Sequence, residues 1–232
     1  MKTIGLIGGL SWESSIEYYR IINETVRERL GGLHSAETLM FSFDFAEIEA
    51  LQAVEDWESA THRMIAAARQ LERGGADCIV ICSNTMHQMA SDVQNAVDIP
   101  LIHIADATAK VIKAKGLSKI ALIGTRYTME QDFYKGRLIN QHELDVVIPD
   151  DDGRTVVHDI IYNELVVGKV EEESRKAYQT VIDDLIASGA EGVILGCTEI
   201  ELLISKPEHS PVPTFATTYL HALAAVDWAL DG

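Results

Sequence analysis

Short runs of apolar, mostly β-branched residues alternate along the chain with longer amphipathic stretches. The runs have the length and composition of buried strands. They lie at residues 3–7, 38–43, 99–104, 119–123, 144–148 and 192–196, with one more run ending before residue 83. Because such runs alternate with helical segments, the pattern predicts an α/β protein with mostly parallel sheets flanked by helices.

The stretches between the strands repeat apolar residues every three or four positions, which predicts helices. The predicted helices cover residues 12–30, 46–54, 57–73, 86–97, 105–115, 130–140, 155–167, 171–188 and 217–230. Ser11 suits the N-cap of the first helix. The acidic turn at residues 149–153 is expected to cap the helix at 155–167 rather than to bind metal. Residues 206–213 are expected to form a proline-bearing connection.

One strand and the turn after it occur twice in the sequence. Residues 75–83 align with residues 189–197, so Ser83 is the counterpart of Cys197. Residues 4–9 likewise resemble residues 120–125, in the same order. The repeat predicts an internal duplication with two similar lobes, 1–100 plus 213–232 and 101–212. We expect these lobes to face each other across a cleft.

Composition narrows the class of protein. The 232 residues are 47% hydrophobic, which suffices for a full core, and the net charge of −17 argues against nucleic acid or an anionic membrane as a partner. No apolar run approaches the roughly 18 residues of a membrane span. The start at Met1 runs directly into a strand, so we expect a cytoplasmic protein. Three cysteines give no disulfide framework and no zinc spacing, so neither a disulfide nor a metal is expected.

Cys197 is the strongest candidate for chemistry. It follows a buried strand, at the end where open α/β sheets bind ligands. A thiol there is either a packed side chain or a reactive group whose pKa is lowered by amides at a helix N-terminus. Apolar neighbours favour packing for Cys78, whereas Thr198 and Glu199 are polar where a core would be apolar, so Cys197 is predicted to be reactive.

Three motifs resemble those of the cofactor-independent aspartate/glutamate racemase family. They are Gly8-Gly9-Leu10-Ser11 at the first turn, Ser83-Asn84-Thr85 with His87 at the first copy of the repeat, and Gly196-Cys197-Thr198-Glu199 at the second. The resemblance covers essentially the whole chain. Glu199 makes the second motif more similar to the aspartate racemase branch.

The resemblance implies a pseudosymmetric two-lobed fold, a homodimer, and an active site in the cleft between the lobes. It also implies an isomerase that uses no metal, pyridoxal phosphate or nucleotide. One group would take the α-proton of an amino acid, aspartate or glutamate first of all, and another would return a proton to the opposite face. Cys197 and the Ser83 position are the expected proton carriers. The residues expected to bind the substrate are Leu10, Ser11, Gln52, Asn84, Thr85, Thr125, Arg126, Thr198 and Glu199.

The sequence departs from the family pattern at residue 83. The family usually has cysteine directly before Asn84, whereas this chain has Ser83 there and a cysteine one residue earlier, at Cys82. Because side chains alternate faces along a strand, Cys82 is predicted to point away from the Ser83 face and to be structural. A serine hydroxyl is a poor proton abstractor without an adjacent base. We therefore expect an asymmetric enzyme in which Cys197 deprotonates one enantiomer readily, whereas deprotonation of the other enantiomer, which begins the reverse direction, is poor.

The substrate stays open among aspartate, glutamate and another amino acid. Aspartate-specific relatives commonly carry a lysine shortly before the position of Gly168 and an arginine after the second strand, and neither is matched here. Gln52 can hydrogen-bond a carboxylate or an amide. Arg126 is either a ligand clamp or a solvated turn residue. His87 either orients Asn84 or tunes a proton carrier, or it is, like His103, an ordinary core histidine.

Two other functions remain open at this point. A single catalytic cysteine also resembles the decarboxylases of the same superfamily, in which case a malonate would be turned over. A binding protein that kept the cleft and lost the chemistry is permitted by Ser83. The racemase is the main prediction.

Overall fold

The computed structural model describes residues 1–204 and 206–231. Packing divides the chain into two compact units. The first consists of Met1–Ile104 and the chain from His221 onward, and the second of Ala105–Leu220. The lobes expected from the repeat divide the chain at residues 100 and 212, whereas the structure places residues 213–220, which include the strand paired with residues 193–195, in the second unit.

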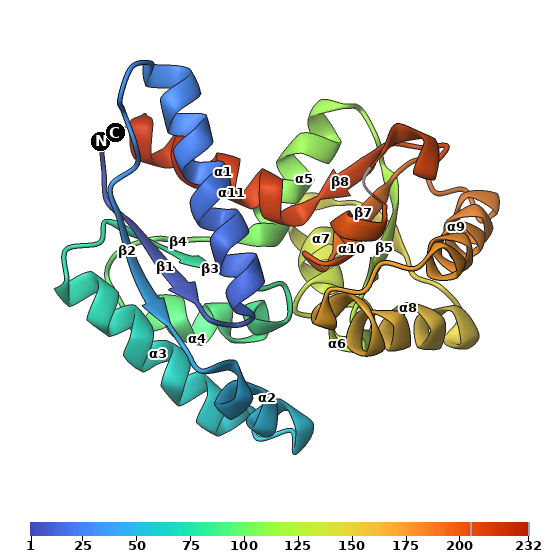
Figure 1. Cartoon of the computed structure of the whole chain (residues 1–232), viewed down its shortest axis with the longest axis horizontal. Coiled ribbons are helices and arrows are strands. Elements are labelled where there is room, and N and C mark those ends of the chain that lie inside the picture. The colour runs from blue at the N-terminus through green and yellow to red at the C-terminus, as the bar shows by residue number, and fades with distance from the viewer. Residues whose placement is uncertain (205, 232) are drawn as a thin grey trace. The chain divides into compact units, whose positions relative to one another are not determined.

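The first unit is a parallel four-stranded sheet with helices on both faces (Figure 1). The strand order is β2-β1-β3-β4, and every neighbouring pair is parallel. Its elements are β1 (Ile4–Gly8), α1 (Trp12–Leu30), β2 (Thr38–Ser42), α2 (Phe45–Ala53), α3 (Trp57–Arg73), β3 (Cys78–Ile81), the 3₁₀ helix η1 (Thr85–Met89), α4 (Ala90–Asn95) and β4 (Leu101–Ile102).

The second unit repeats this topology with the order β6-β5-β7-β8, again with every pair parallel. Its elements are α5 (Ile104–Ala114), β5 (Lys119–Gly124), α6 (Arg126–Glu130), α7 (Lys135–His142), β6 (Asp145–Val147), α8 (Asp151–Asn163), η2 (Leu165–Val167), α9 (Glu172–Ala187), β7 (Val193–Gly196), α10 (Ile200–Leu203), η3 (Pro207–His209), β8 (Thr214–Ala216) and α11 (Thr217–Leu230). Helices α5 and α11 each continue into the first unit. The predicted class, two similar α/β lobes with mostly parallel sheets, is confirmed.

The first sheet packs a separate apolar core on each face. On one face, Ile7, Ile79 and Ile81 contact α3 and α4, and on the other, Ile4 and Val80 contact α1 and α11. Figure 1 shows these helix pairs on opposite sides of the sheet. The alternation along β1 and β3 follows from the two-residue period of a strand.

The second sheet buries Ala121, Ile123, Val193 and Leu195 against α8, α9 and α10. Intervening residues such as Leu122 are fully buried as well. A central strand that is apolar at every position is what a sheet covered on both faces requires. The central strands β3 and β7 are buried at every position.

Several element boundaries differ from the sequence predictions. The expected helix at 130–140 begins only at Lys135, as α7, and is preceded by the separate short helix α6 at Arg126–Glu130. The expected helix at 86–97 begins as the 3₁₀ helix η1. The helix expected at 155–167 begins at Asp151, because Asp150 is its N-cap and accepts a hydrogen bond from Gly153 N at 2.8 Å. The strand expected at 99–104 pairs only at β4, and the strand β8 was not predicted.

None of the helices within residues 1–204 and 206–231 is long and apolar enough to cross a membrane.

Candidate functional site

Two polar segments follow the central strands at matching positions of the two sheets. Ser83, Asn84 and Thr85 follow β3 in the first unit, and Cys197, Thr198 and Glu199 follow β7 in the second. In parallel sheets, ligands bind at the carboxyl ends of strands. The structure therefore supplies one candidate half-site in each unit.

In the first unit, the loop between β1 and α1 is held by buried serines. Ser11 is the N-cap of α1, as predicted, and its Oγ accepts a hydrogen bond from Ser14 N at 3.2 Å. Ser15 Oγ accepts one from Gly9 N at 2.8 Å. Ser14 Oγ donates to Cys82 O at 3.4 Å, so this loop, with Leu10 and Ser11, lies beside the end of β3. The glycine-serine loop and the Ser83 segment thus share one edge of the sheet.

Ser83 is half-buried and begins the turn after β3. Its Oγ accepts a hydrogen bond from Met86 N at 3.4 Å. His87 does not activate this hydroxyl, because its Nδ1 lies 2.6 Å from Ser83 O and its Nε2 accepts from Ile104 N at 3.2 Å. Both ring nitrogens bond the backbone, so His87 does not serve as a base for Ser83 in this arrangement.

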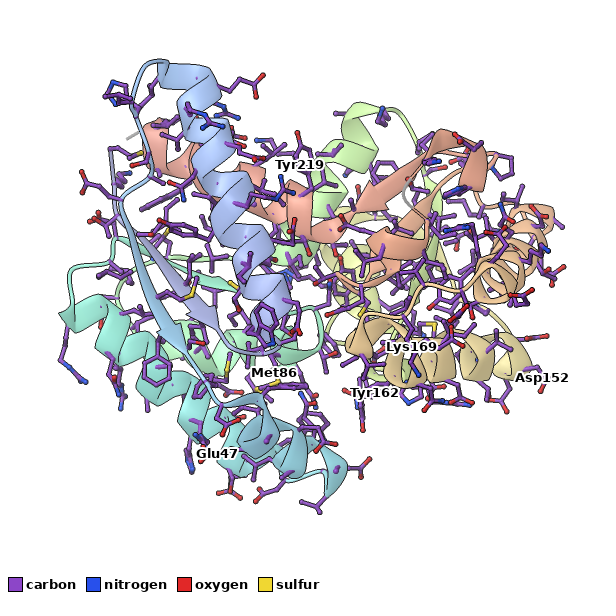
Figure 2. All side chains as sticks on the ribbon, in the orientation of Figure 1. Glu47, Met86, Asp152, Tyr162, Lys169 and Tyr219 are labelled. Atoms are coloured by element: carbon purple, nitrogen blue, oxygen red, sulfur yellow. The ribbon has the colours of Figure 1, made fainter. Side chains whose placement is uncertain are left out.

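The neighbouring predicted binding residues are buried around the same turn. Asn84 is 5% exposed and Thr85 is 9% exposed, at the start of η1. Gln52 comes from α2, and its Nε2 donates to Met86 Sδ at 3.0 Å. Met86 is labelled in Figure 2, near α2. The structure therefore brings Gln52 next to the Ser83 segment.

Cys82 packs inside the core rather than at the site. It is fully buried in the cluster that contains Val80 and Tyr18, against α1 and α11. Burial raises the pKa of its thiol far above the usual range. Cys78 belongs to the same cluster, and burial raises its pKa to about 12. The prediction that both thiols are structural agrees with this packing.

The second unit repeats the N-cap at its own first loop. Thr125 caps α6 as Ser11 caps α1, and its Oγ1 accepts a hydrogen bond from Thr128 N at 3.3 Å. Thr125 is buried at the end of β5, the counterpart of β1. The internal duplication thus extends to the side chains that hold the loops.

Arg126, the predicted cation, already has carboxylate partners. Its Nη1 lies 2.9 Å from Glu130 Oε1 and 3.5 Å from Asp151 Oδ1, and its Nη2 donates to Thr155 Oγ1 at 2.6 Å. Its backbone N donates to His158 Nδ1 at 3.3 Å. A guanidinium that two carboxylates neutralise attracts a further anion weakly, which favours the surface-residue interpretation.

Cys197 and Glu199 are in direct contact. The half-buried thiol donates a hydrogen bond to Glu199, with 2.9 Å between Sγ and Oε2. Burial raises the pKa of Cys197 well above its usual range, and the Glu199 carboxylate raises it further by charge repulsion. The expectation of a lowered pKa was therefore wrong: α10 has only four residues, and the nearest charge is negative.

Thr198 is held by the start of α11. Its Oγ1 accepts a hydrogen bond from Thr218 Oγ1 at 3.3 Å, while Thr217 Oγ1 donates to Leu195 O at 2.9 Å. Glu199 occupies the N-cap position of α10 without a capping hydrogen bond from its side chain, and its Oε2 accepts the hydrogen of the Cys197 thiol.

Sequence reasoning missed two side chains beside these residues. The buried Tyr178 on α9 lies close enough to Cys197 for the thiolate charge to affect its pKa, which burial raises well above the usual range. His158 on α8 receives the Arg126 N–H, and its ring lies 4.7 Å from that of Tyr162, which is labelled in Figure 2. Both belong to ordinary amphipathic helices, so no local pattern distinguished them.

Among the residues that the structure describes, no three histidine, cysteine, aspartate or glutamate side chains are grouped to hold a metal ion.

Comparison with known proteins gives one consistent result. The sequence profile of the Asp/Glu/hydantoin racemase family matches residues 7–225. A solved structure of a candidate Asp/Glu racemase from Yersinia pestis is 54% identical and covers 99% of this chain and 100% of that one, with a TM-score of 0.94. An aspartate racemase homologue from Pyrococcus horikoshii is 35% identical over 99% of this chain and 100% of its own, with a TM-score of 0.86.

A more distant curated relative has a stated activity. The broad specificity amino-acid racemase RacX of Bacillus subtilis is 24% identical over 153 residues, which is 64% of this chain and 63% of RacX.

Proposed function

Because the chain belongs to the Asp/Glu/hydantoin racemase family, we propose that it inverts the α-carbon of an amino acid by direct proton transfer, with Cys197 as the main proton carrier and no cofactor. The observation that carries this proposal is the hydrogen bond from the Cys197 thiol to Glu199. A thiol with a raised pKa cannot abstract a proton until its own proton has left, and Glu199 is an acceptor at hydrogen-bond distance.

The Cys197 proton passes to Glu199, and the thiolate then takes the α-proton of the substrate. The two electrons of the broken C–H bond delocalise into the substrate carboxylate. Inversion needs a proton carrier on the other face of the planar carbon, and Ser83 is the residue that the repeat supplies. Its hydroxyl donates a proton there, and the resulting alkoxide takes a proton from water. Glu199 then gives its proton to the hydroxide so formed, which returns every group to its starting state.

Serine makes the two directions unequal. A thiol has a reference pKa of about 8.5, whereas a hydroxyl needs an adjacent base to abstract a proton. His87 bonds the backbone through both nitrogens and does not act as that base. The equilibrium constant for racemisation remains one, so the asymmetry concerns only the turnover and the affinity of each enantiomer.

The substrate carboxylate is proposed to be held by Asn84, Thr85 and Thr198 and by the backbone amides of the Gly8–Ser11 and Thr125 loops. Such donors stabilise the negative charge that grows during deprotonation. Gln52 is the proposed contact for the substrate side chain, because it lies beside the Ser83 segment and is neutral. Aspartate, glutamate and neutral amino acids are therefore the substrates to test first, in line with the broad specificity stated for RacX.

Racemisation of an amino-acid panel without added cofactor tests this proposal. Each L- and D-amino acid is incubated with the wild-type chain and with Cys197→Ser, and the products are separated on a chiral column. Conversion that Cys197→Ser abolishes supports the racemase. Carbon dioxide release from a substituted malonate with no amino-acid conversion identifies a decarboxylase. Thermal stabilisation by an amino acid without conversion identifies a binding protein.

A further inference from the structure

The carbonyl of Ser83 lies just beyond the hydrogen-bonded part of the sheet. Cys82 N is the last ladder donor of β3, bonding Ile7 O at 2.9 Å, and Ser83 N turns back to Ile81 O at 2.9 Å. The ladder therefore does not fix the direction of the chain from Ser83 onward. Beyond the ladder, the turn is held by its own backbone bonds, including His87 N to Asn84 O at 3.1 Å, and by side chains that bond its carbonyls.

The His87 ring bonds the Ser83 carbonyl. Its Nδ1 lies 2.6 Å from Ser83 O, and because a carbonyl can only accept, Nδ1 carries the hydrogen. Its Nε2 lies 3.2 Å from Ile104 N, which can only donate, so Nε2 carries the lone pair. The two backbone partners thus select a single neutral tautomer. The ring connects the Ser83 turn to the start of α5 and is 2% exposed.

A second buried histidine, His221, lies beside His87 but bonds other parts of the chain. His221 is fully buried, its ring centroid lies 5.4 Å from that of His87, and it too has partners at both nitrogens. Its Nε2 lies 2.7 Å from Ile102 O in β4, and its Nδ1 lies 2.8 Å from Tyr18 Oη. Neither Ile102 nor Tyr18 belongs to the Ser83 turn, so His221 is a matched control for loss of a buried histidine.

We propose that His87 is a positioning residue for the proton carrier of the first unit, because its Nδ1–H bond to the Ser83 carbonyl fixes the turn formed by Ser83, Asn84 and Thr85. The kinetic part of this inference rests on the proposed function, whereas the local order of the turn does not. His87 acts through the turn and does not touch the substrate. It sets where the Ser83 hydroxyl points.

Two substitutions separate the bonds of His87. The amide nitrogen of His87→Asn reaches about as far as Nδ1 and keeps a donor for Ser83 O, but nothing reaches Ile104 N. The amide oxygen of His87→Gln reaches about as far as Nε2 and keeps an acceptor for Ile104 N. His87→Leu keeps neither, and His221→Leu removes the control histidine.

Amide hydrogen exchange tests the local claim without any substrate. We expect the amides of Thr85 and Met86 to exchange faster in His87→Leu and His87→Gln, and at nearly the wild-type rate in His87→Asn. The amide of Ile104 should exchange faster in His87→Asn and at nearly the wild-type rate in His87→Gln. Unchanged exchange at Thr85 and Met86 in His87→Leu, or equal exchange in the Asn and Gln variants, would overturn the inference.

Kinetics test the catalytic consequence. We expect His87→Leu to lower kcat about 10- to 100-fold, because a displacement near 1 Å can cost that much, with a smaller change in KM. His87→Asn should recover kcat to within about threefold of wild type. His221→Leu should keep the wild-type kcat once the rate is corrected for the fraction of folded protein.

If His87→Leu and His221→Leu lose the same kcat, and in each the loss is explained by lower stability, His87 has only a structural role. A wild-type chain that turns over no amino acid would refute the proposed function, and the exchange pattern alone would then decide the role of His87.

Discussion

The Cys197 thiol donates a hydrogen bond to the Glu199 carboxylate two residues later, with 2.9 Å between Sγ and Oε2. This pair combines a protonated thiol with the acceptor for its proton. The corresponding segment of the first unit has Ser83, and both ring nitrogens of its neighbour His87 bond the backbone. The duplicated fold thus carries two chemically unequal half-sites.

Replacing Glu199 with glutamine tests this pair. The carboxylate raises the pKa of Cys197 by charge repulsion and by accepting its proton, so Glu199→Gln should lower the thiol pKa. We expect the midpoint of the pH dependence of iodoacetamide alkylation at Cys197 to fall by on the order of one pH unit. Racemisation should nevertheless fall about 100-fold, because the proton acceptor is lost.

Glu201→Gln is the control for this variant. Glu201 also raises the pKa of Cys197, but it is the smallest of the causes, so its removal should shift the alkylation midpoint less. A midpoint that does not move in Glu199→Gln would show that the carboxylate does not govern the thiol.

Gly9 should be intolerant of a side chain. It has φ of +70°, in the left-handed region, and a Cβ there would overlap the backbone of Phe43. We expect Gly9→Ala to lower the free energy of unfolding by about 3 kcal/mol or more. Urea denaturation measures this loss.

Gly32→Ala separates the overlap from the backbone strain. Gly32 has φ of +59° but nothing within 4 Å of the added Cβ, so its replacement should cost only about 1 kcal/mol. Equal losses at the two positions would mean that the Phe43 contact does not constrain the loop.

The buried thiols predict a loss of stability at alkaline pH. Burial raises the pKa of Cys78 to about 12 and that of Cys82 further, so both stay protonated in the folded chain. In the unfolded chain they lose protons near their reference pKa of about 8.5. Above that pH the unfolded state binds fewer protons, and each thiol lowers the free energy of unfolding by about 1.4 kcal/mol per pH unit.

The slope of the free energy of unfolding against pH distinguishes this effect from general chemical damage at alkaline pH. Cys82→Ala removes one titrating thiol, so its free energy of unfolding should fall less steeply than that of wild type between pH 9 and about pH 10.5. Urea titrations at several pH values give both slopes. Parallel curves would contradict the assignment of the alkaline loss to this thiol.

Much of the fold was predictable because strong local patterns specify it. Fully apolar runs bounded by glycine gave β1, β3, β5 and β7, and the two-residue period of a strand placed Cys82 in the core. Strand β8 was missed because it has three residues and follows Pro211 and Pro213, so no apolar run marks it. The start of α8 was misplaced because consecutive aspartates resemble a turn, although they favour the first turn of a helix.

The candidate site was predictable in identity but not in electrostatics. The repeat and the motifs singled out Ser83, Cys197 and Glu199 as residues of interest. They did not show that Glu199 would be hydrogen-bonded to the thiol, nor that α10 would be too short to lower its pKa. The ion pair of Arg126 with Glu130 has the local i,i+4 spacing of a helix, but its pair with Asp151 depends on packing between α6 and α8, which no local pattern encodes.

The central claim is that Cys197 removes the α-proton of one enantiomer while Ser83 serves the other face poorly. The most direct measurement is the initial rate of α-proton exchange of each enantiomer in heavy water, followed by mass spectrometry. We predict rapid exchange for one enantiomer and at least about tenfold slower exchange for the other, a gap that Ser83→Cys narrows and Cys197→Ser removes by abolishing the rapid exchange. Equal rates for both enantiomers in the wild-type chain, or rapid exchange that persists in Cys197→Ser, would contradict this account.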